Sequence, residues 1–167
     1  MNPLEILVYA TPVSLAALGE TVSQKAGVIN IGLEGTMLTG AFVALLATQA
    51  SGSPVVGLVV GALAAVALAA FQALFTLALA LDQVVIGTAI NLFALGVTST
   101  VYRAQFGQSG SLMSLPSTIP GWVGVLLVLM LAPLIVWLLN RTRLGLALRA
   151  AGEYPNAVEA SQFSVLR

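Results

Sequence analysis

The chain has 167 residues, of which 59% are apolar and 7% charged, and its six basic side chains balance six acidic ones. Soluble domains carry about 25% charged residues, so this composition is typical of an integral membrane protein, and a balanced charge offers nothing to recruit nucleic acid. The sequence has neither Cys nor His, which excludes the usual zinc sites, thiol nucleophiles and Ser-His-Asp triads, and we expect no metal and no cofactor.

Apolar stretches long enough to cross a bilayer occur along most of the chain. Since an α-helix rises about 1.5 Å per residue, about 20 apolar residues cross a hydrocarbon layer about 30 Å thick. The stretches predict an all-α fold, a polytopic transmembrane helical bundle with about five membrane segments. These segments are Leu4–Gly19, Leu33–Ala50, Pro54–Leu81, Gln83–Tyr102 and Gly121–Asn140.

The first segment is short and contains Pro12, so it is either a tilted span or a re-entrant segment. A polar connection, Glu20–Asn30, follows it and contains Lys25, the only lysine of the chain.

The entry to the second segment holds three glycines between Gly27 and Gly35, which allow irregular backbone and close approach of neighbouring segments. Asn30 can cap the following helix, and Glu34 would then lie favourably near its positive end. Two interpretations stay open: a capped helix start packed against neighbours, or a broken helix lining a solute pathway. No Gly-Lys-Ser/Thr sequence follows, so this is not a phosphate-binding P-loop.

In the third segment, small residues recur at every fourth position. This spacing lets helix backbones approach closely in lipid, so we expect a helix-packing face. The face comprises Gly57, Gly61, Ala65, Ala69 and Ala73.

The fourth segment is unusually polar, with Gln83 at its start and Asn91 near its middle. An unpaired amide in hydrocarbon is costly, so Asn91 should face the bundle interior. It either links two helices or hydrogen-bonds a polar solute on a translocation path. Gln72, late in the third segment, has the same two interpretations. We select Asn30, Glu34, Gln83 and Asn91 as candidate pathway residues.

After Asn140 the composition changes, because half of all charges of the chain follow it. If the five segments alternate, one side of the membrane holds every basic residue except Arg103. The positive-inside rule then places the C-terminal segment, residues 141–167, in the cytoplasm of a multi-pass cell-membrane protein. The N-terminus lies outside.

Within that cytoplasmic segment, Leu144, Leu148 and Ala151 recur at helical spacing and predict a short amphipathic helix that Gly152 ends. Asn156 and Glu159 resemble a capping box for a second helix. The segment is either a solvated tail or a docking helix for a partner. The acidic residues of the whole chain are scattered, so we expect no enzymatic activity.

Three stretches together resemble a known family: Lys25–Leu38, Asp82–Leu92 and Arg141–Ala157. They are similar to the permease subunits of ABC importers for nucleosides and simple sugars, in the group that includes ribose and branched-chain amino acid permeases. Members of this family continue through further spans, so the resemblance implies that this chain corresponds to the N-terminal half or so of a permease.

The resemblance also implies partners. Such permeases pair with an identical or different permease subunit, receive solute from an extracytoplasmic binding protein, and bind a separate ATP-binding cassette ATPase through a coupling helix. That helix would map onto Gly152–Ser161. The coupling residues it implies are Arg149, Gly152, Glu153, Pro155, Asn156 and Glu159.

Two other functions stay open. An ion-coupled secondary transporter would need no ATPase, but the scarcity of acidic residues inside the segments counts against it. A small structural membrane protein would not explain the glycine-rich entry or the segment after Arg141.

Overall fold

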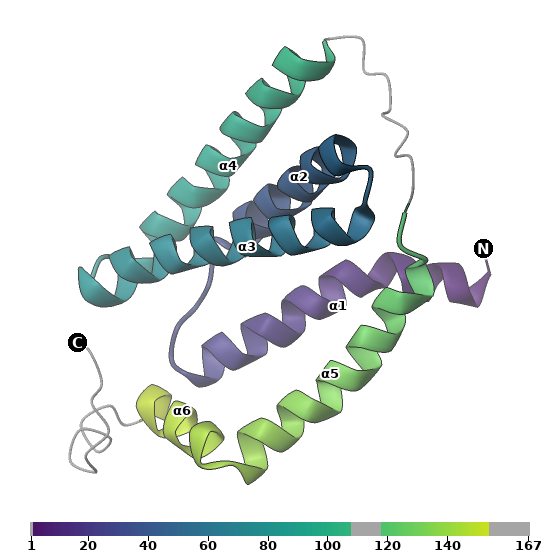
Figure 1. The fold of residues 1–167 in the computed structure, drawn as a ribbon. Helices are drawn as coiled ribbons and strands as arrows, with labels where there is room; N and C mark the ends of the chain where they lie inside the picture. Colours follow the sequence, from purple (N-terminus) through teal and green to yellow (C-terminus); the bar gives the residue numbers. More distant parts are fainter. Residues whose placement is uncertain (1, 108–117, 154–167) are drawn as a thin grey trace. The chain divides into compact units, whose positions relative to one another are not determined.

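The computed structural model describes residues 2–107 and 118–153 (Figure 1). In these ranges the chain forms helices and no strand, which confirms the all-α fold. The elements are α1 (Pro3–Lys25), α2 (Leu33–Ser51), α3 (Pro54–Ala73), the π-helical turn η1 (Leu74–Ala78), α4 (Gln83–Phe106), α5 (Gly121–Arg141) and α6 (Arg143–Glu153).

Four helices in the described ranges are long and apolar enough to cross a membrane: Pro3–Lys25, Pro54–Ala78, Gln83–Phe106 and Gly121–Arg141. The predicted bundle is therefore confirmed, but the predicted count of five is corrected to four. The predicted segment Leu33–Ala50 does form a helix, α2. It falls outside the set because Glu34, Gln49 and several Thr and Gly residues lower its hydropathy.

The first span is longer than predicted, because α1 is a continuous helix of 23 residues that includes Pro12. The neighbouring hydroxyls turn back onto the helix, with Thr11 Oγ1 donating to Leu7 O at 3.0 Å and Ser14 Oγ to Ala10 O at 2.9 Å. The residues from Glu20 to Lys25, expected in a polar connection, form its last turns. A re-entrant segment is not needed to explain this length.

The third segment ends earlier than predicted. Its helix passes into the π-helical turn and stops at Ala78, and Ala80 then adopts a positive φ of 50°. Asp82 starts the next helix, since its Oδ1 accepts hydrogen bonds from Val84 N at 2.8 Å and Val85 N at 3.1 Å. This N-cap satisfies two of the four backbone donors that a helix start leaves unpaired.

The chain divides into two compact units. One, the α1–α5–α6 unit, comprises Met1–Asn30 and Pro120–Arg167, and the other, the α2–α3–α4 unit, comprises Ile31–Ile119.

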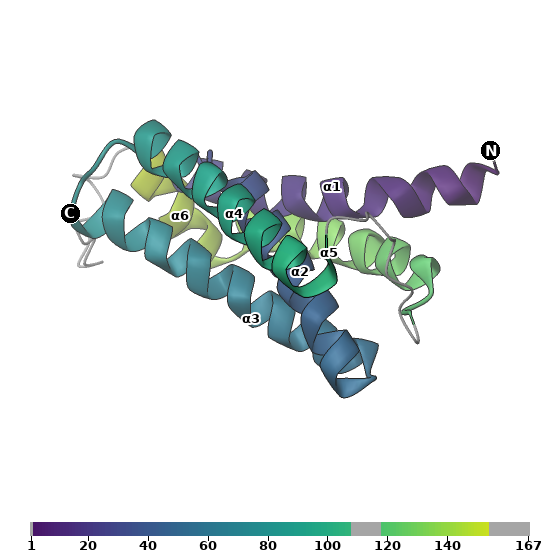
Figure 2. The same ribbon diagram turned by 90° about the horizontal axis from the view of Figure 1, so that it is seen from above.

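In the α2–α3–α4 unit, α2 packs against both α3 and α4 (Figures 1 and 2). A Cβ built on Gly61 would lie 2.6 Å from both Gly40 O and Ala44 Cβ, and one on Gly57 would lie 2.7 Å from Ala44 O. The α2 and α3 backbones therefore approach each other too closely for larger side chains at these two positions.

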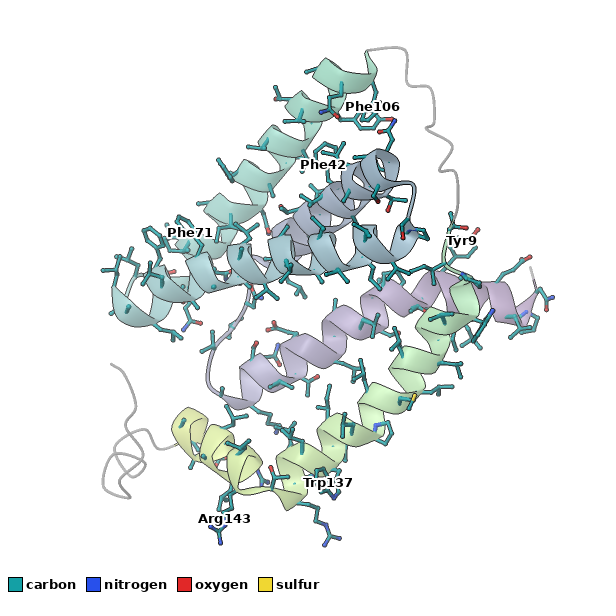
Figure 3. All side chains as sticks on the ribbon, viewed as in Figure 1. Tyr9, Phe42, Phe71, Phe106, Trp137 and Arg143 are labelled. Atoms are coloured by element: carbon teal, nitrogen blue, oxygen red, sulfur yellow. The ribbon has the colours of Figure 1, made fainter. Side chains whose placement is uncertain are left out.

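In the α1–α5–α6 unit, α1 and α5 lie side by side and run in the same direction (Figures 1 and 2). A Cβ on Gly121, at the start of α5, would meet the Val8 side chain, and one on Gly124 would meet that of Thr11. Just beyond α5, Thr142 Oγ1 accepts a hydrogen bond from Gly145 N at 3.1 Å and so caps α6. The labelled side chains of Trp137 and Arg143 mark this corner in Figure 3.

Candidate functional site

The start of α2 is held by a side chain from α4. Asn91 Oδ1 accepts a hydrogen bond from Gly35 N at 2.7 Å, and Asn91 Nδ2 donates one to Ile31 O at 2.9 Å. One amide therefore binds both a backbone donor of the first turn of α2 and a carbonyl just before it. In effect α4 supplies the cap that α2 lacks in its own sequence.

Glycines permit this contact. A Cβ on Gly35 would lie 2.9 Å from Asn91 Oδ1 and 3.0 Å from Ile90 O. A Cβ on Gly87 would lie 2.8 Å from both Gly32 N and Ile31 Cβ. Both faces of the contact thus depend on the absence of a side chain. We call residues Ile31–Gly35 the α2 entry.

The α2 entry also meets Gln72 of α3. This side chain is 5% exposed, and its Oε1 has no hydrogen-bond partner among the described residues. A Cβ on Gly32 would collide with that same amide. A buried acceptor without a partner costs about 1–3 kcal/mol, so it marks a place where a water or a solute hydroxyl would bind favourably.

The predicted cap of α2 is wrong. The N-cap residue is Gly32, without a side-chain hydrogen bond, and Asn30 belongs to the other unit. There the Asn30 N–H donates to Glu20 Oε1 at 3.2 Å. Asn30 Oδ1 and Glu20 Oε2 have no hydrogen-bond partner among the described residues. Asn30 does not cap α2 because the loop holds its backbone N–H against the Glu20 side chain of α1.

The structure places the other two candidate pathway residues as follows. Glu34 is exposed in the first turn of α2, next to the Asn91 contact. Gln83 is the half-buried first residue of α4, about 12 Å along the axis from Asn91. Asn91 therefore shares a site with the α2 entry, whereas Gln83 lies more than two turns away.

In the α1–α5–α6 unit, α6 contacts the end of α1. A Cβ on Gly152 would lie 2.6 Å from Lys25 O and 2.9 Å from Gly27 N. Gly27 has a φ of 83° and its own Cβ would lie 3.0 Å from Gly152 Cα. Gly152 was expected to end the helix, but α6 continues to Glu153. Its small size instead allows two backbones to touch.

The predicted coupling residues lie partly within the structure. Arg149 is half-buried in α6, and its Nε has no hydrogen-bond partner among the described residues. Glu153 is exposed at the end of the helix. Pro155, Asn156 and Glu159, with the predicted second helix, lie outside the described residues. Across residues 2–107 and 118–153, no group of three or more acidic side chains could hold a metal ion.

Comparison with known proteins identifies one family and several relatives. A family model described as "Branched-chain amino acid transport system / permease component" matches residues 2–167. The guanosine ABC transporter permease protein NupQ of Bacillus subtilis (strain 168) is 30% identical over 187 aligned positions, covering 96% of this chain and 58% of NupQ. No solved structure matches.

Two further relatives are similar over almost the whole chain. The nucleoside ABC transporter permease protein NupC of Lactococcus lactis subsp. cremoris is 29% identical, covering 99% of this chain and 61% of NupC. A Haloferax volcanii protein provisionally named as a glucose ABC transporter permease, TsgC13, is 32% identical, covering 95% of this chain and 53% of its own length. The chain thus spans somewhat more than half the length of these relatives.

Proposed function

Because this chain belongs to the family of branched-chain amino acid transport system permease components, we propose that it forms part of the membrane pathway of an ATP-driven importer. The solute is a nucleoside or a simple sugar, the two classes named for its relatives. In this proposal the chain is not an enzyme, and ATP hydrolysis takes place in a separate ATPase subunit.

The observation that carries the proposal is the α2 entry. Asn91 lies about 12 Å along α4 from its first residue, so the irregular backbone that it binds lies within the length of a membrane-spanning helix. Non-helical backbone at that depth is tolerated only where it is buried in protein or lines a cavity. Transporters use non-helical backbone next to helix ends at this depth to form solute sites.

Asn91 acts in this proposal as the residue that positions the α2 entry. Gln72 Oε1, which has no hydrogen-bond partner among the described residues, is the neighbouring group that a solute hydroxyl or a water would reach. That Asn30, Glu34 and Gln83 also line the pathway stays a prediction.

The arrangement of the α1–α5–α6 unit supports the proposed orientation. Because α1 and α5 run in the same direction, their C-terminal ends, Lys25 and Arg141, lie at the same end of the unit. The contact between Gly152 and Lys25 O adds α6, with Arg143 and Arg149, to that end. This cluster of basic residues favours a cytoplasmic location for residues 141–167 by the positive-inside rule.

The ATPase would then bind α6. This helix presents Leu144 and Leu146, which are 68% and 62% exposed, and the exposed Arg143 directly precedes Leu144 in the chain. Exposed apolar residues rimmed by charge are typical of a protein interface. A second permease subunit and an extracytoplasmic solute-binding protein complete the proposed assembly.

A pull-down from detergent-solubilised membranes tests this function. The tagged chain should retain an ATP-binding cassette ATPase, identified by mass spectrometry and by its ATP hydrolysis. The double variant Leu144→Gln/Leu146→Gln should lose it. Leu4→Gln is the matched control, because Leu4 is 66% exposed at the opposite end of α1. If neither the unaltered chain nor the control retains an ATPase, the importer proposal fails.

A further inference from the structure

A cleft of about 280 Å³ opens between α2 and α4, away from the α2 entry. Leu38 and Phe42 of α2 and Leu95 of α4 form its apolar wall. Its polar wall comes from α4 alone and consists of Thr98, Ser99, Tyr102 and Arg103. Figure 3 shows the labelled Phe42 between the two helices.

Three of the four polar side chains of this cleft make no hydrogen bond within the described residues. The exception is Thr98, whose Oγ1 donates to Ala94 O of its own helix at 2.7 Å, just as Thr100 Oγ1, outside the cleft, donates to Gly96 O at 2.7 Å. No such bond involves the side-chain polar atoms of Ser99, Tyr102 or Arg103 within residues 2–107 and 118–153. The side chains of Ser99, Tyr102 and Arg103 therefore line the cleft without a hydrogen bond to any described residue.

The cleft lies near the C-terminal end of α4, since Arg103 is in the last turn of that helix. Asn91, which binds the α2 entry, lies 12 residues earlier in the same helix, or about 18 Å along its axis. The cleft is therefore separate from the α2 entry, although both belong to the α2–α3–α4 unit.

We propose that this cleft, at the C-terminal end of α4, is a recognition site for a neutral, polyhydroxylated ring compound. The inference rests on the proposed function and adds a location to it. A flat ring face packs against Phe42, while Ser99, Tyr102 and Arg103 hydrogen-bond ring hydroxyls or carbonyls. The cleft volume of about 280 Å³ lies at the small end of ligand pockets, which start at about 300 Å³, and this favours a small solute.

The charge of the cleft also favours a neutral solute over a lipid phosphate. Arg103 is the one cation among its lining residues, and the other polar groups are neutral hydroxyls. A phosphodiester is usually bound by stronger positive charge or by bidentate arginine contacts supported by further donors. A lipid headgroup is therefore an alternative that the experiment must separate.

The test is uptake by the complete importer reconstituted in vesicles, with radiolabelled guanosine, uridine, ribose and glucose as probes. Ser99→Ala should raise the KM for the transported probe by about fivefold and Arg103→Gln by about tenfold or more, since the lost hydrogen bonds are neutral and charged respectively. The maximal rate of uptake and the amount of ATPase in the complex should stay unchanged. Thr100→Ala is the matched control, because its hydroxyl is on α4 but outside the cleft.

The outcomes separate the two proposals. If the unaltered importer takes up none of the probes, the proposed function fails and the recognition site fails with it. If a probe is taken up and both cleft variants keep the unaltered KM, only the recognition site is refuted. An Arg103→Gln effect that is seen in vesicles with anionic lipid but absent in neutral vesicles would assign the cleft to a lipid headgroup and also overturn the inference.

Discussion

Replacing Asn91 by alanine should destabilise the α2–α3–α4 unit and free the α2 entry. The substitution removes the acceptor of Gly35 N and the donor to Ile31 O. Each hydrogen bond contributes about 0.5–1.5 kcal/mol net in proteins, and side-chain bonds between membrane helices average about 0.6 kcal/mol. Two bonds lost together, in a contact too close for water to enter, should cost about 2 kcal/mol of unfolding free energy.

Reversible unfolding in mixed micelles, followed by circular dichroism, measures this loss. Asn91→Asp keeps an acceptor for Gly35 N but places a carboxylate oxygen against Ile31 O, so it should destabilise the unit at least as much as alanine does. The control is Thr88→Ala, because the Thr88 hydroxyl bonds only Val84 O of its own helix.

A change below about 0.3 kcal/mol for Asn91→Ala would refute the capping role. If stability falls while uptake and solute affinity stay unchanged in the complete importer, Asn91 links the helices and takes no part in the pathway.

Three further predictions use the same logic. Gly35→Ala should cost about 2 kcal/mol in the same unfolding assay because its Cβ would meet backbone, whereas Gly96→Ala, with nothing within 4 Å, should be neutral or slightly stabilising; equal effects would contradict the close approach. Gly152→Ala should lower ATP-driven uptake, because its Cβ would meet the backbone of Lys25 and Gly27, and should leave ATPase binding intact. Gly19→Ala, with nothing within 4 Å of its Cβ, should change neither. Unaltered uptake in Gly152→Ala would show that transport does not depend on the contact between α6 and α1. Asp82→Ala should lower the unfolding free energy by about 1 kcal/mol by removing the N-cap of α4, and Asp82→Ser should retain most of that stability because its hydroxyl can also cap. If Asp82→Ser is as unstable as Asp82→Ala, the carboxylate stabilises α4 through its charge and not through the cap.

Hydropathy and length predicted the all-helical membrane fold well, because these are properties of the sequence alone. The extent of α1 was missed because Glu20 and Gln24 look like loop residues beside an apolar run. They are good helix formers, and their side chains hydrogen-bond each other at 3.1 Å, four residues apart in the last turns of the helix. Local composition thus underestimated a helix that its own side chains extend.

The α2 entry shows where sequence reasoning could not go further. Asn91 and the three glycines each stood out, but the cap of Gly35 comes from a residue 56 positions away in the chain. No local pattern specifies such a partner, so the nearer Asn30 was the natural but incorrect choice. Asp82 lies directly before an apolar run, and that position is a signal by which its capping role could have been found.

The order of the two units along the chain sets a demand on biosynthesis. Val8 of α1 can pack against Gly121 of α5 only after Gly121 has been synthesised, which is 121 − 8 = 113 residues later. At about 5–20 residues per second, α1 waits roughly 6 to 23 s for its neighbour. During that time the whole α2–α3–α4 unit, Ile31–Ile119, emerges. During this interval the first helix lacks its packing partner α5, although it is the least apolar of the four candidate spans.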